Sequence, residues 1–406
     1  MGKLKYWRSL PTRRRCANKV ADGNFYNARY WLLCFSIFLF FMGFNMIVPE
    51  LPAHLTSLGG EQHKGLIIAL FTLTAAISRP FSGKLADTIG RVPVIVFGII
   101  VSTVAIFFYP LSHTVTFFLT LRLLHGFSTG FTPTGASAYL ADIVPAHRRG
   151  EAMGIYGTMS GLGMALAPAL GGWLAYNYGI NALFYTSGVV GGLSLLMTFG
   201  LRETLVQKQP LTWALFRLKR QDIFEPRAAG PALVYGLCFF SFGAVLTVMP
   251  DMSTWLGIAN KGWFFTVSTI ASLFVRFAAG KVSDQYGRVR ILQLSALLYA
   301  GAMGLAALAH EPWLFFASAV LLGLGIGMLS PTVLAWTIDV SDNQSRGRAL
   351  ATLYIALEIG IGLGAWSAGA IYANQTANLP IVFGLSALLA LSAFAYLVWA
   401  QVLGKK

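Results

Sequence analysis

Long apolar stretches recur along the whole chain, and they constrain its fold more than any other feature. A helix needs about 20 apolar residues to cross the ~30 Å hydrocarbon layer of a bilayer, because each residue adds roughly 1.5 Å. Such stretches occupy 31–52, 65–86, 92–112, 115–140, 151–175, 180–201, 230–252, 262–282, 289–309, 312–338, 349–372 and 380–402. The sequence therefore predicts an all-α membrane protein with twelve transmembrane helices.

The composition also indicates a lipid environment. Of 406 residues, 56% are hydrophobic and only 11% are charged. A soluble domain does not have enough interior to bury so large an apolar fraction. Lipid is therefore expected to cover most of the chain.

Basic residues are distributed unevenly along the chain. If the N-terminus is cytoplasmic, 25 of the 30 Lys and Arg residues fall on the cytoplasmic side. This asymmetry follows the positive-inside rule, and it predicts a multi-pass protein of the cytoplasmic (inner) membrane with both termini in the cytoplasm. The net charge of +15 then sets topology and contacts membrane lipids, and we expect no nucleic-acid partner.

The two halves of the chain repeat each other at an offset of 197 residues. The segment Arg79–Arg91 is similar to Arg276–Arg288, and the same offset relates Asp142 to Asp339. This repeat predicts two pseudo-symmetric, parallel six-helix bundles. The expected organisation is a basic N-terminal arm (1–29) without a cleaved signal peptide, a first bundle (30–201), a cytoplasmic linker (202–229), a second bundle (230–402) and a tail (403–406).

The loop after the second span carries a recognisable motif. Its pattern Gly83-x-Leu-Ala-Asp87-x-x-Gly90-Arg91 resembles the loop motif of the major facilitator superfamily, although Thr88 and Val92 replace the usual basic residues. The resemblance implies a cytoplasmic gate in which Asp87 and Arg91 pair across the gap between the halves. The other members of this predicted gate are Asp142, Gly280, Asp284, Gly287 and Arg288.

Two further motifs resemble the drug:proton antiporter branch of that superfamily. Arg122-x-x-x-Gly126-x-x-x-Gly130 in span four is similar to a motif of proton-coupled members. The second motif lies in span five, where Ala167 replaces the usual glycine, and consists of Gly154, Gly163, Pro168, Gly171 and Gly172. The resemblance implies proton-coupled export, whereas helix packing alone is the alternative explanation of these glycines.

Charges within the spans need a partner, water or a function. Arg79 and Arg276 repeat each other within about 10 Å of the cytoplasmic face, so we interpret both as structural residues that snorkel to that face. Arg122 and Glu358 have no counterpart in the other half. Both fall in the middle of the ~30 Å core, which favours a functional role.

Glu358 is the leading candidate to carry the coupled proton or to hold a cationic substrate group, because burial disfavours a charged carboxyl. A structural hydrogen bond is the alternative. Arg122 is expected to modulate a neighbouring acid. His125 changes charge near physiological pH but is also a candidate packing residue. Glu50 and Asp251, at the outer ends of spans one and seven, are candidates for titrating acids or an outside gate.

The resemblance also implies a central cavity among spans one, four, seven and ten. Candidate residues of this cavity, in addition to Glu358, are Asn45, Ser128, Phe131, Ser241 and Trp336. The helical faces that these residues occupy are not fixed by the sequence.

These features predict a secondary active transporter that works by alternating access and exports a drug, siderophore or metabolite against inward proton flow. The alternatives are an importer or uniporter on the same fold, and, from other classes, a membrane enzyme or a non-transporting sensor. No phosphate-binding loop, metal motif or catalytic motif is evident, so we expect no cofactor, no metal site and no enzymatic activity. The expected partners are a small-molecule substrate, protons and lipids, and the expected state is a monomer.

Overall fold

The computed structural model describes residues 26–145, 148–212, 215, 224–341 and 346–403, without the side chains of 150, 277–282, 284, 346 and 403. Most of the predicted N-terminal arm and tail fall outside this range. Gly280 and Asp284 of the predicted gate also belong to the part whose side chains are not described.

Twelve long helices coincide with the twelve predicted stretches, which confirms the predicted fold class. The first-half helices are α1 (Ala28–Ile47), α3 (Lys64–Thr88), α4 (Arg91–Phe108), α5 (Val115–Ile143), α6 (Arg149–Tyr178) and α7 (Ile180–Thr198). The second-half helices are α8 (Ala229–Trp255), α9 (Trp263–Tyr286), α10 (Arg288–Ala307), α11 (Pro312–Val340), α12 (Arg346–Tyr372) and α13 (Leu379–Leu403). The described residues form no β-strand.

Short elements extend or connect these helices. A turn of 3-10 helix, η1 (Val48–Glu50), and the short helix α2 (Leu51–Ser57) continue α1, because prolines near their first positions interrupt the regular helix. The remaining short turns are η2 (Glu61–His63), η3 (Tyr109–Leu111), η7 (Pro226–Ala228) and η8 (Thr376–Asn378).

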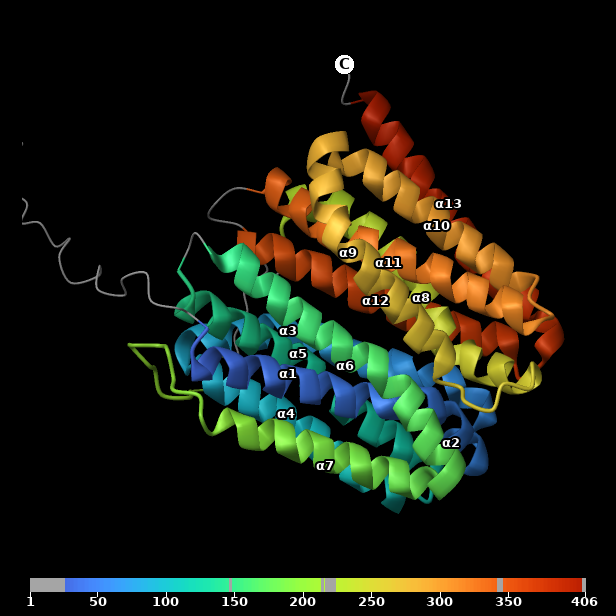
Figure 1. Cartoon of the computed structure of the whole chain (residues 1–406), viewed down its shortest axis with the longest axis horizontal. Coiled ribbons are helices and arrows are strands. Elements are labelled where there is room, and N and C mark those ends of the chain that lie inside the picture. The colour runs from blue at the N-terminus through green and yellow to red at the C-terminus, as the bar shows by residue number, and fades with distance from the viewer. Residues whose placement is uncertain (1–25, 146–147, 213–214, 216–223, 342–345, 404–406) are drawn as a thin grey trace, which may run out of the picture.

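The helices form two bundles that lie side by side, the first blue to green and the second yellow to red (Figure 1). In the first bundle α1 packs against α6 and α7, and α5 packs against α3 and α4. The second bundle repeats this pattern, with α8 against α12 and α13, and α11 against α9 and α10. The bundles meet mainly where α3 packs against α12 and where α6 packs against α9.

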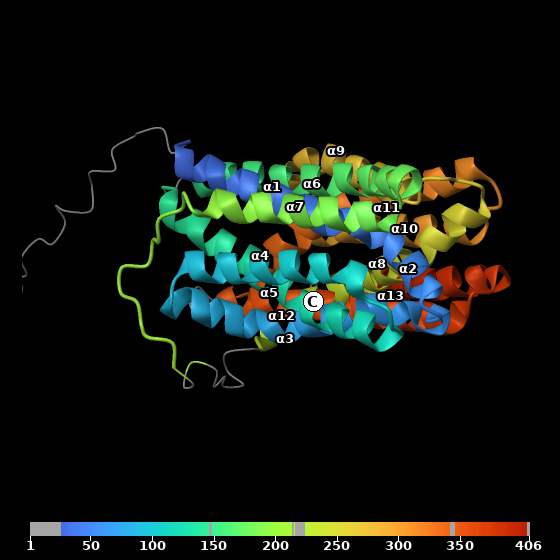
Figure 2. The same ribbon diagram turned by 90° about the horizontal axis from the view of Figure 1, so that it is seen from below.

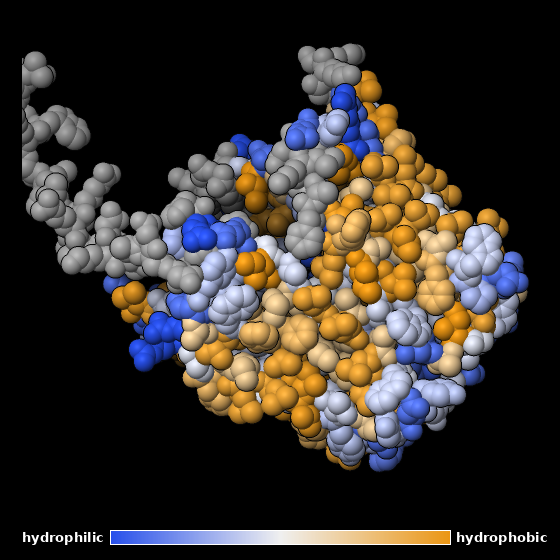
Figure 3. Space-filling model, viewed as in Figure 1, coloured by the Kyte–Doolittle hydropathy of each residue, from blue (hydrophilic) through white to orange (hydrophobic). Residues whose placement is uncertain are grey.

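The helices run nearly parallel to one common direction (Figure 2). Among the described residues, nine helical segments are long and apolar enough to cross a membrane by hydropathy alone. Hydrophobic side chains cover a broad middle band of one face, and hydrophilic side chains gather at its two ends (Figure 3). We call the end at which α1 begins and α13 finishes the termini face.

The glycines of the span-five motif allow α6 to pack closely on α1. A Cβ on Gly163 would lie 2.5 Å from the carbonyl oxygen of Phe38, and one on Gly171 would lie 2.0 Å from that of Met46. Real Cβ atoms do not approach a carbonyl oxygen so closely. Gly154, in contrast, has open space where its Cβ would be. These glycines therefore differ in their structural role although they belong to one motif.

We predict that Gly163→Ala lowers the free energy of unfolding by about 1–3 kcal/mol, because the added methyl group forces α6 away from α1. Gly154→Ala is the matched control in the same helix, and it should leave stability unchanged or slightly raised. The melting temperatures of the purified variants in one detergent measure the difference. A Gly163→Ala variant that melts no lower than Gly154→Ala would show that the close approach of α6 to α1 is wrong.

Candidate functional site

A central cavity of about 570 Å³ lies between the two bundles. Side chains from α1, α3, α5, α6, α8 and α12 line it, so both bundles contribute. Its aromatic lining residues are Phe41, Phe44, Phe71, Phe239, Phe242 and Tyr354. The cavity therefore offers a largely apolar environment with a few polar groups, as is usual for a small-molecule site.

Asn45 and Glu358 line this cavity. Two other candidates are turned away from it, because they face neighbouring helices of the first bundle. Ser128 is fully buried, and its backbone packs closely on Gly98 of α4. Phe131 packs against Phe97 of the same helix, with ring centroids 4.6 Å apart.

Two second-bundle candidates also lie outside the central cavity. Ser241 is fully buried, and its hydroxyl donates to the carbonyl oxygen of Ser386 on α13 at 3.2 Å. Trp336 on α11 packs near Gly230 at the start of α8. The expected position of span ten is corrected accordingly: α12 lines the central cavity, whereas α11 does not.

Glu358 forms a buried ion pair with Arg79 across the two bundles. Its Oε1 accepts hydrogen bonds from Arg79 Nε at 3.2 Å and from Arg79 Nη2. The guanidinium also lies 4.9 Å from the centre of the Tyr354 ring. This corrects the interpretation of Arg79 as a scaffold residue that snorkels to the termini face. Its repeat counterpart Arg276 is exposed at the edge of a second cavity, so the two arginines are not equivalent.

Arg122 lies on the wall of the central cavity and is fully buried. Its Nε donates to the carbonyl oxygen of Ile67 at 2.9 Å, and its Nη1 donates to the hydroxyl of Tyr109 at 3.3 Å. The Phe71 ring lies over the guanidinium, 4.5 Å from its centre. Nη2 has no hydrogen-bond partner among the described residues.

His125 lies one turn from Arg122 and has both ring nitrogens in hydrogen bonds. Nδ1 is 2.9 Å from the hydroxyl of Tyr109, and Nε2 is 3.0 Å from that of Ser102. The side chain is fully buried and does not line the central cavity. This environment agrees with the packing alternative for His125.

Two ion pairs join the bundles at the end opposite the termini face. Lys64 Nζ is 2.5 Å from Asp251 Oδ2, and Lys261 Nζ is 2.7 Å from Glu50 Oε2. The lysines are repeat counterparts at the offset of 197 residues, and each begins or precedes the second helix of its bundle. The acids are candidates from the sequence alone, whereas the lysines are not, although the repeat relates the two lysines to each other.

The glycine after each lysine closes the same end by backbone packing. A Cβ on Gly65 would lie 2.5 Å from the carbonyl oxygen of Ala365, and one on Gly262 would lie 1.8 Å from that of Pro168. Ala365 and Pro168 are themselves repeat counterparts. We call these two ion pairs and two glycine contacts the outer seal. It follows the pseudo-twofold relation of the bundles.

The gate motif at the termini face forms ion pairs within each bundle. Arg91 contacts Asp87 at 2.7 Å and Asp142 at 3.1 Å, and Arg288 contacts Asp339 at 3.2 Å. The expected pairing of Asp87 and Arg91 across the halves is therefore wrong for this conformation. Gly90 and Gly287 directly precede α4 and α10 with φ of +131° and +90°, a conformation that favours glycine.

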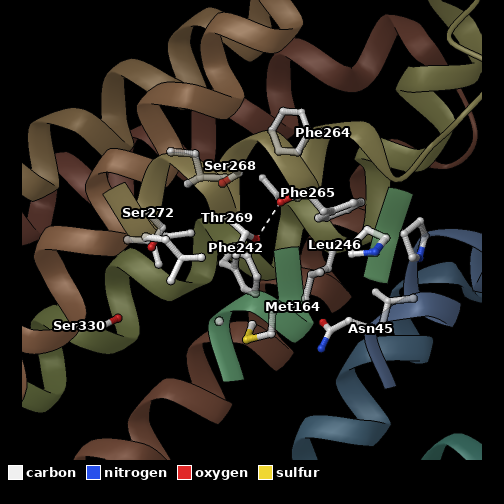
Figure 4. A pocket seen from close by; sticks show the side chains of 18 of the residues that line it. Asn45, Met164, Phe242, Leu246, Phe264, Phe265, Ser268, Thr269, Ser272 and Ser330 are labelled. Atoms are coloured by element: carbon white, nitrogen blue, oxygen red, sulfur yellow. Dashed lines mark hydrogen bonds between the residues drawn. The ribbon is translucent and has the colours of Figure 1, made fainter. Parts of the chain in front are cut away.

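A second cavity of about 190 Å³ lies between α6, α8, α9 and α11 (Figure 4). It adjoins the central cavity, since six residues line both cavities: Asn45, Val48, Met164, Phe239, Phe242 and Leu246. Hydroxyl groups of Ser268, Ser272 and Ser330 line one side. This chamber adds neutral hydrogen-bonding groups beside the apolar centre.

The central cavity extends toward the termini face. Its lining residues Gly83, Ser137 and Gly347 are all within about two turns of the helix ends at that face. The outer seal closes the opposite end. Among the described residues, the central cavity therefore extends to the termini face and is sealed at the other end, which is the arrangement of one of the two end states that alternating access requires.

Comparison with known proteins agrees with this architecture. The family model of the Major Facilitator Superfamily matches residues 33–258 and 231–405. Quinolone resistance protein NorA of Staphylococcus aureus (strain COL) is 25% identical over 359 residues, covering 85% of this chain and 90% of that protein. Multidrug resistance protein MdtG of Serratia proteamaculans (strain 568) is 28% identical over 385 residues, covering 91% and 92%.

Solved structures share the fold at low sequence identity. The human organic anion transporter MFSD10 (TETRAN) has a TM-score of 0.70 and 18% identity, covering 91% of this chain and 99% of that one. Peptide transporter POT in complex with sulfate has a TM-score of 0.76 and 16% identity, covering 91% and 94%. Family model, relatives and fold indicate a membrane transporter rather than an enzyme. The chain belongs to the Major Facilitator Superfamily.

Proposed function

We propose that this protein is a proton-coupled exporter of small organic molecules, with Glu358 as the residue that carries the proton. The observation that carries the proposal is the buried Arg79–Glu358 ion pair, which joins the two bundles inside the central cavity. The names of the relatives, which refer to quinolone and multidrug resistance, support export of a drug-like substrate.

The distribution of basic residues supports a cytoplasmic termini face. The described conformation is then inward-facing, with its cavity open to the cytoplasm. We further propose that the protein is a monomer in the cytoplasmic membrane, with the domain boundaries given by the sequence. A substrate would enter from the cytoplasm and leave after the outer seal opens.

The ion pair links proton binding to the positions of the bundles. Arg79 belongs to α3 of the first bundle, and Glu358 belongs to α12 of the second. A proton on Glu358 removes its negative charge and weakens the bond between the bundles, whereas a deprotonated Glu358 restores it. Because protonation changes the relative free energies of two conformations, those conformations must in turn bind the proton with different affinities. This reciprocity is the physical basis of coupling.

The proton gradient supplies the driving force for export. Each charge that crosses the membrane contributes ~2.3 kcal/mol per 100 mV of membrane potential. One proton per substrate therefore gives a driving force large enough for net export of a neutral substrate. Asn45 and the aromatic residues of the central cavity are the proposed substrate contacts.

We predict that Glu358→Gln abolishes proton-driven transport but retains exchange of substrate, because the amide cannot release a proton. In proteoliposomes with a fluorescent quinolone as probe, an imposed pH gradient should stimulate the wild-type rate at least about tenfold more than the variant rate. Glu311→Gln is the control, since Glu311 is exposed and outside the cavity. An unchanged pH dependence in Glu358→Gln would show that Glu358 does not carry the coupled proton. Substrate that moves in the same direction as the protons, and not against them, would favour an importer.

We predict that reversing one charge of the outer seal shifts the protein toward the outward-open state. Lys261→Glu places two acids together at the Glu50 site, and like charges repel. The distance between spin labels at the exposed positions 56 and 254 should then increase. The double variant Glu50→Lys with Lys261→Glu restores opposite charges and should restore the shorter distance. Identical distance distributions in all three proteins would show that these ion pairs do not control the outer end.

A further inference from the structure

We infer that Arg122 forms a subsite for the anionic group of the substrate, so that the central cavity selects flat aromatic molecules carrying a carboxylate or similar monoanionic group. This inference rests on the proposed transport function and specifies its substrate class. The motif resemblance assigned Arg122 only to proton coupling.

The wall of the central cavity carries a positive charge that no acidic side chain among the described residues neutralises. Among the described residues that line the cavity, the acidic and basic side chains are Arg79, Arg122 and Glu358. Arg79 and Glu358 neutralise each other in their ion pair. The remaining charge is the positive charge of Arg122, which has no carboxylate partner among the described ion pairs. The cavity therefore favours an anion over a cation.

The guanidinium of Arg122 is held in place but keeps one nitrogen without a hydrogen-bond partner among the described residues. Two of its nitrogens are held by neutral oxygens, from Ile67 and Tyr109, which fix its position without cancelling its charge. The third nitrogen, Nη2, is buried and unpartnered. A buried donor without a partner is costly, and a hydrogen bond to a charged group is worth more than one to a neutral group. An anionic ligand atom would satisfy both requirements.

Phe71 covers this guanidinium and also lines the central cavity. Its ring covers Arg122 and also stacks on Phe44, with ring centroids 5.1 Å apart. Arg122 has no exposed surface in the described conformation, so the ligand's anionic group reaches Nη2 when the Phe71 side chain changes rotamer. The ligand's aromatic body then packs against Phe44 and the phenylalanines of α8. Apolar body and anionic group together define the proposed substrate class.

A series of ligands that differ only in charge tests the inference on the full-length protein in detergent. The probes are 2-naphthoate, its neutral amide and the cationic 2-naphthylmethylamine, with affinities measured by calorimetry at pH 7.5. We expect the carboxylate to bind at least about tenfold more tightly than the amide, and the amine to bind more weakly than either. Equal affinities, or preference for the amine, would overturn the inference without any variant.

Arg122→Gln should reduce carboxylate affinity to that of the amide and leave amide affinity unchanged. Arg276→Gln is the matched control, because Arg276 is an exposed arginine outside the central cavity. An equal loss in the control would overturn the inference. The affinity for naphthoate is also compared in gluconate and chloride buffers, and we expect it to be the same in both. A strong decrease in chloride would show that the subsite binds an inorganic anion and would overturn the inference. Proton-driven flux of the quinolone probe is measured separately, so failure of the anion subsite and failure of proton-coupled transport give different results.

Discussion

The structure depends on an ion pair, Arg79–Glu358, that is buried in the central cavity between the two bundles, away from the two ion pairs of the outer seal. Removing one partner of such a pair costs about 3–5 kcal/mol, because the other charge stays buried without compensation. The Arg79–Glu358 pair therefore contributes to the free energy with which the bundles dock. A proton on Glu358 would change this contribution in the native protein, as a substitution does in a variant.

The outer seal complements this central pair. Each bundle supplies a lysine and a glycine to one half of the seal, and an acid and a backbone carbonyl to the other half. Because both ion pairs and both glycine contacts join one bundle to the other, a tilt of one bundle against the other acts on both halves of the seal. The described ion pairs of the gate motif, Arg91–Asp142 and Arg288–Asp339, lie within each bundle in this conformation.

The sequence was sufficient to predict the fold, because hydrophobic span length, charge asymmetry and the internal repeat are independent constraints that agree. It was less informative about the site. In helices that are apolar on nearly all faces, hydropathy does not show which face meets the cavity, and so Ser128, Phe131, Ser241 and Trp336 were misplaced. Arg79 was misjudged because repeated residues were assumed to have equivalent roles. Its partner, Glu358, is present in one half only, so the repeat breaks at that point.

The protonation state of Glu358 is the most direct test of the account. Infrared difference spectra of the wild-type protein between pH 8 and pH 5.5 report the C=O band of a newly protonated carboxylic acid. The same spectra of Glu358→Gln show how much of that band comes from Glu358. The account predicts a buried carboxylic acid band that appears on acidification in the wild type and is missing in Glu358→Gln. A band that persists in the variant at full intensity would show that another acid takes up the proton and would contradict the proposed coupling.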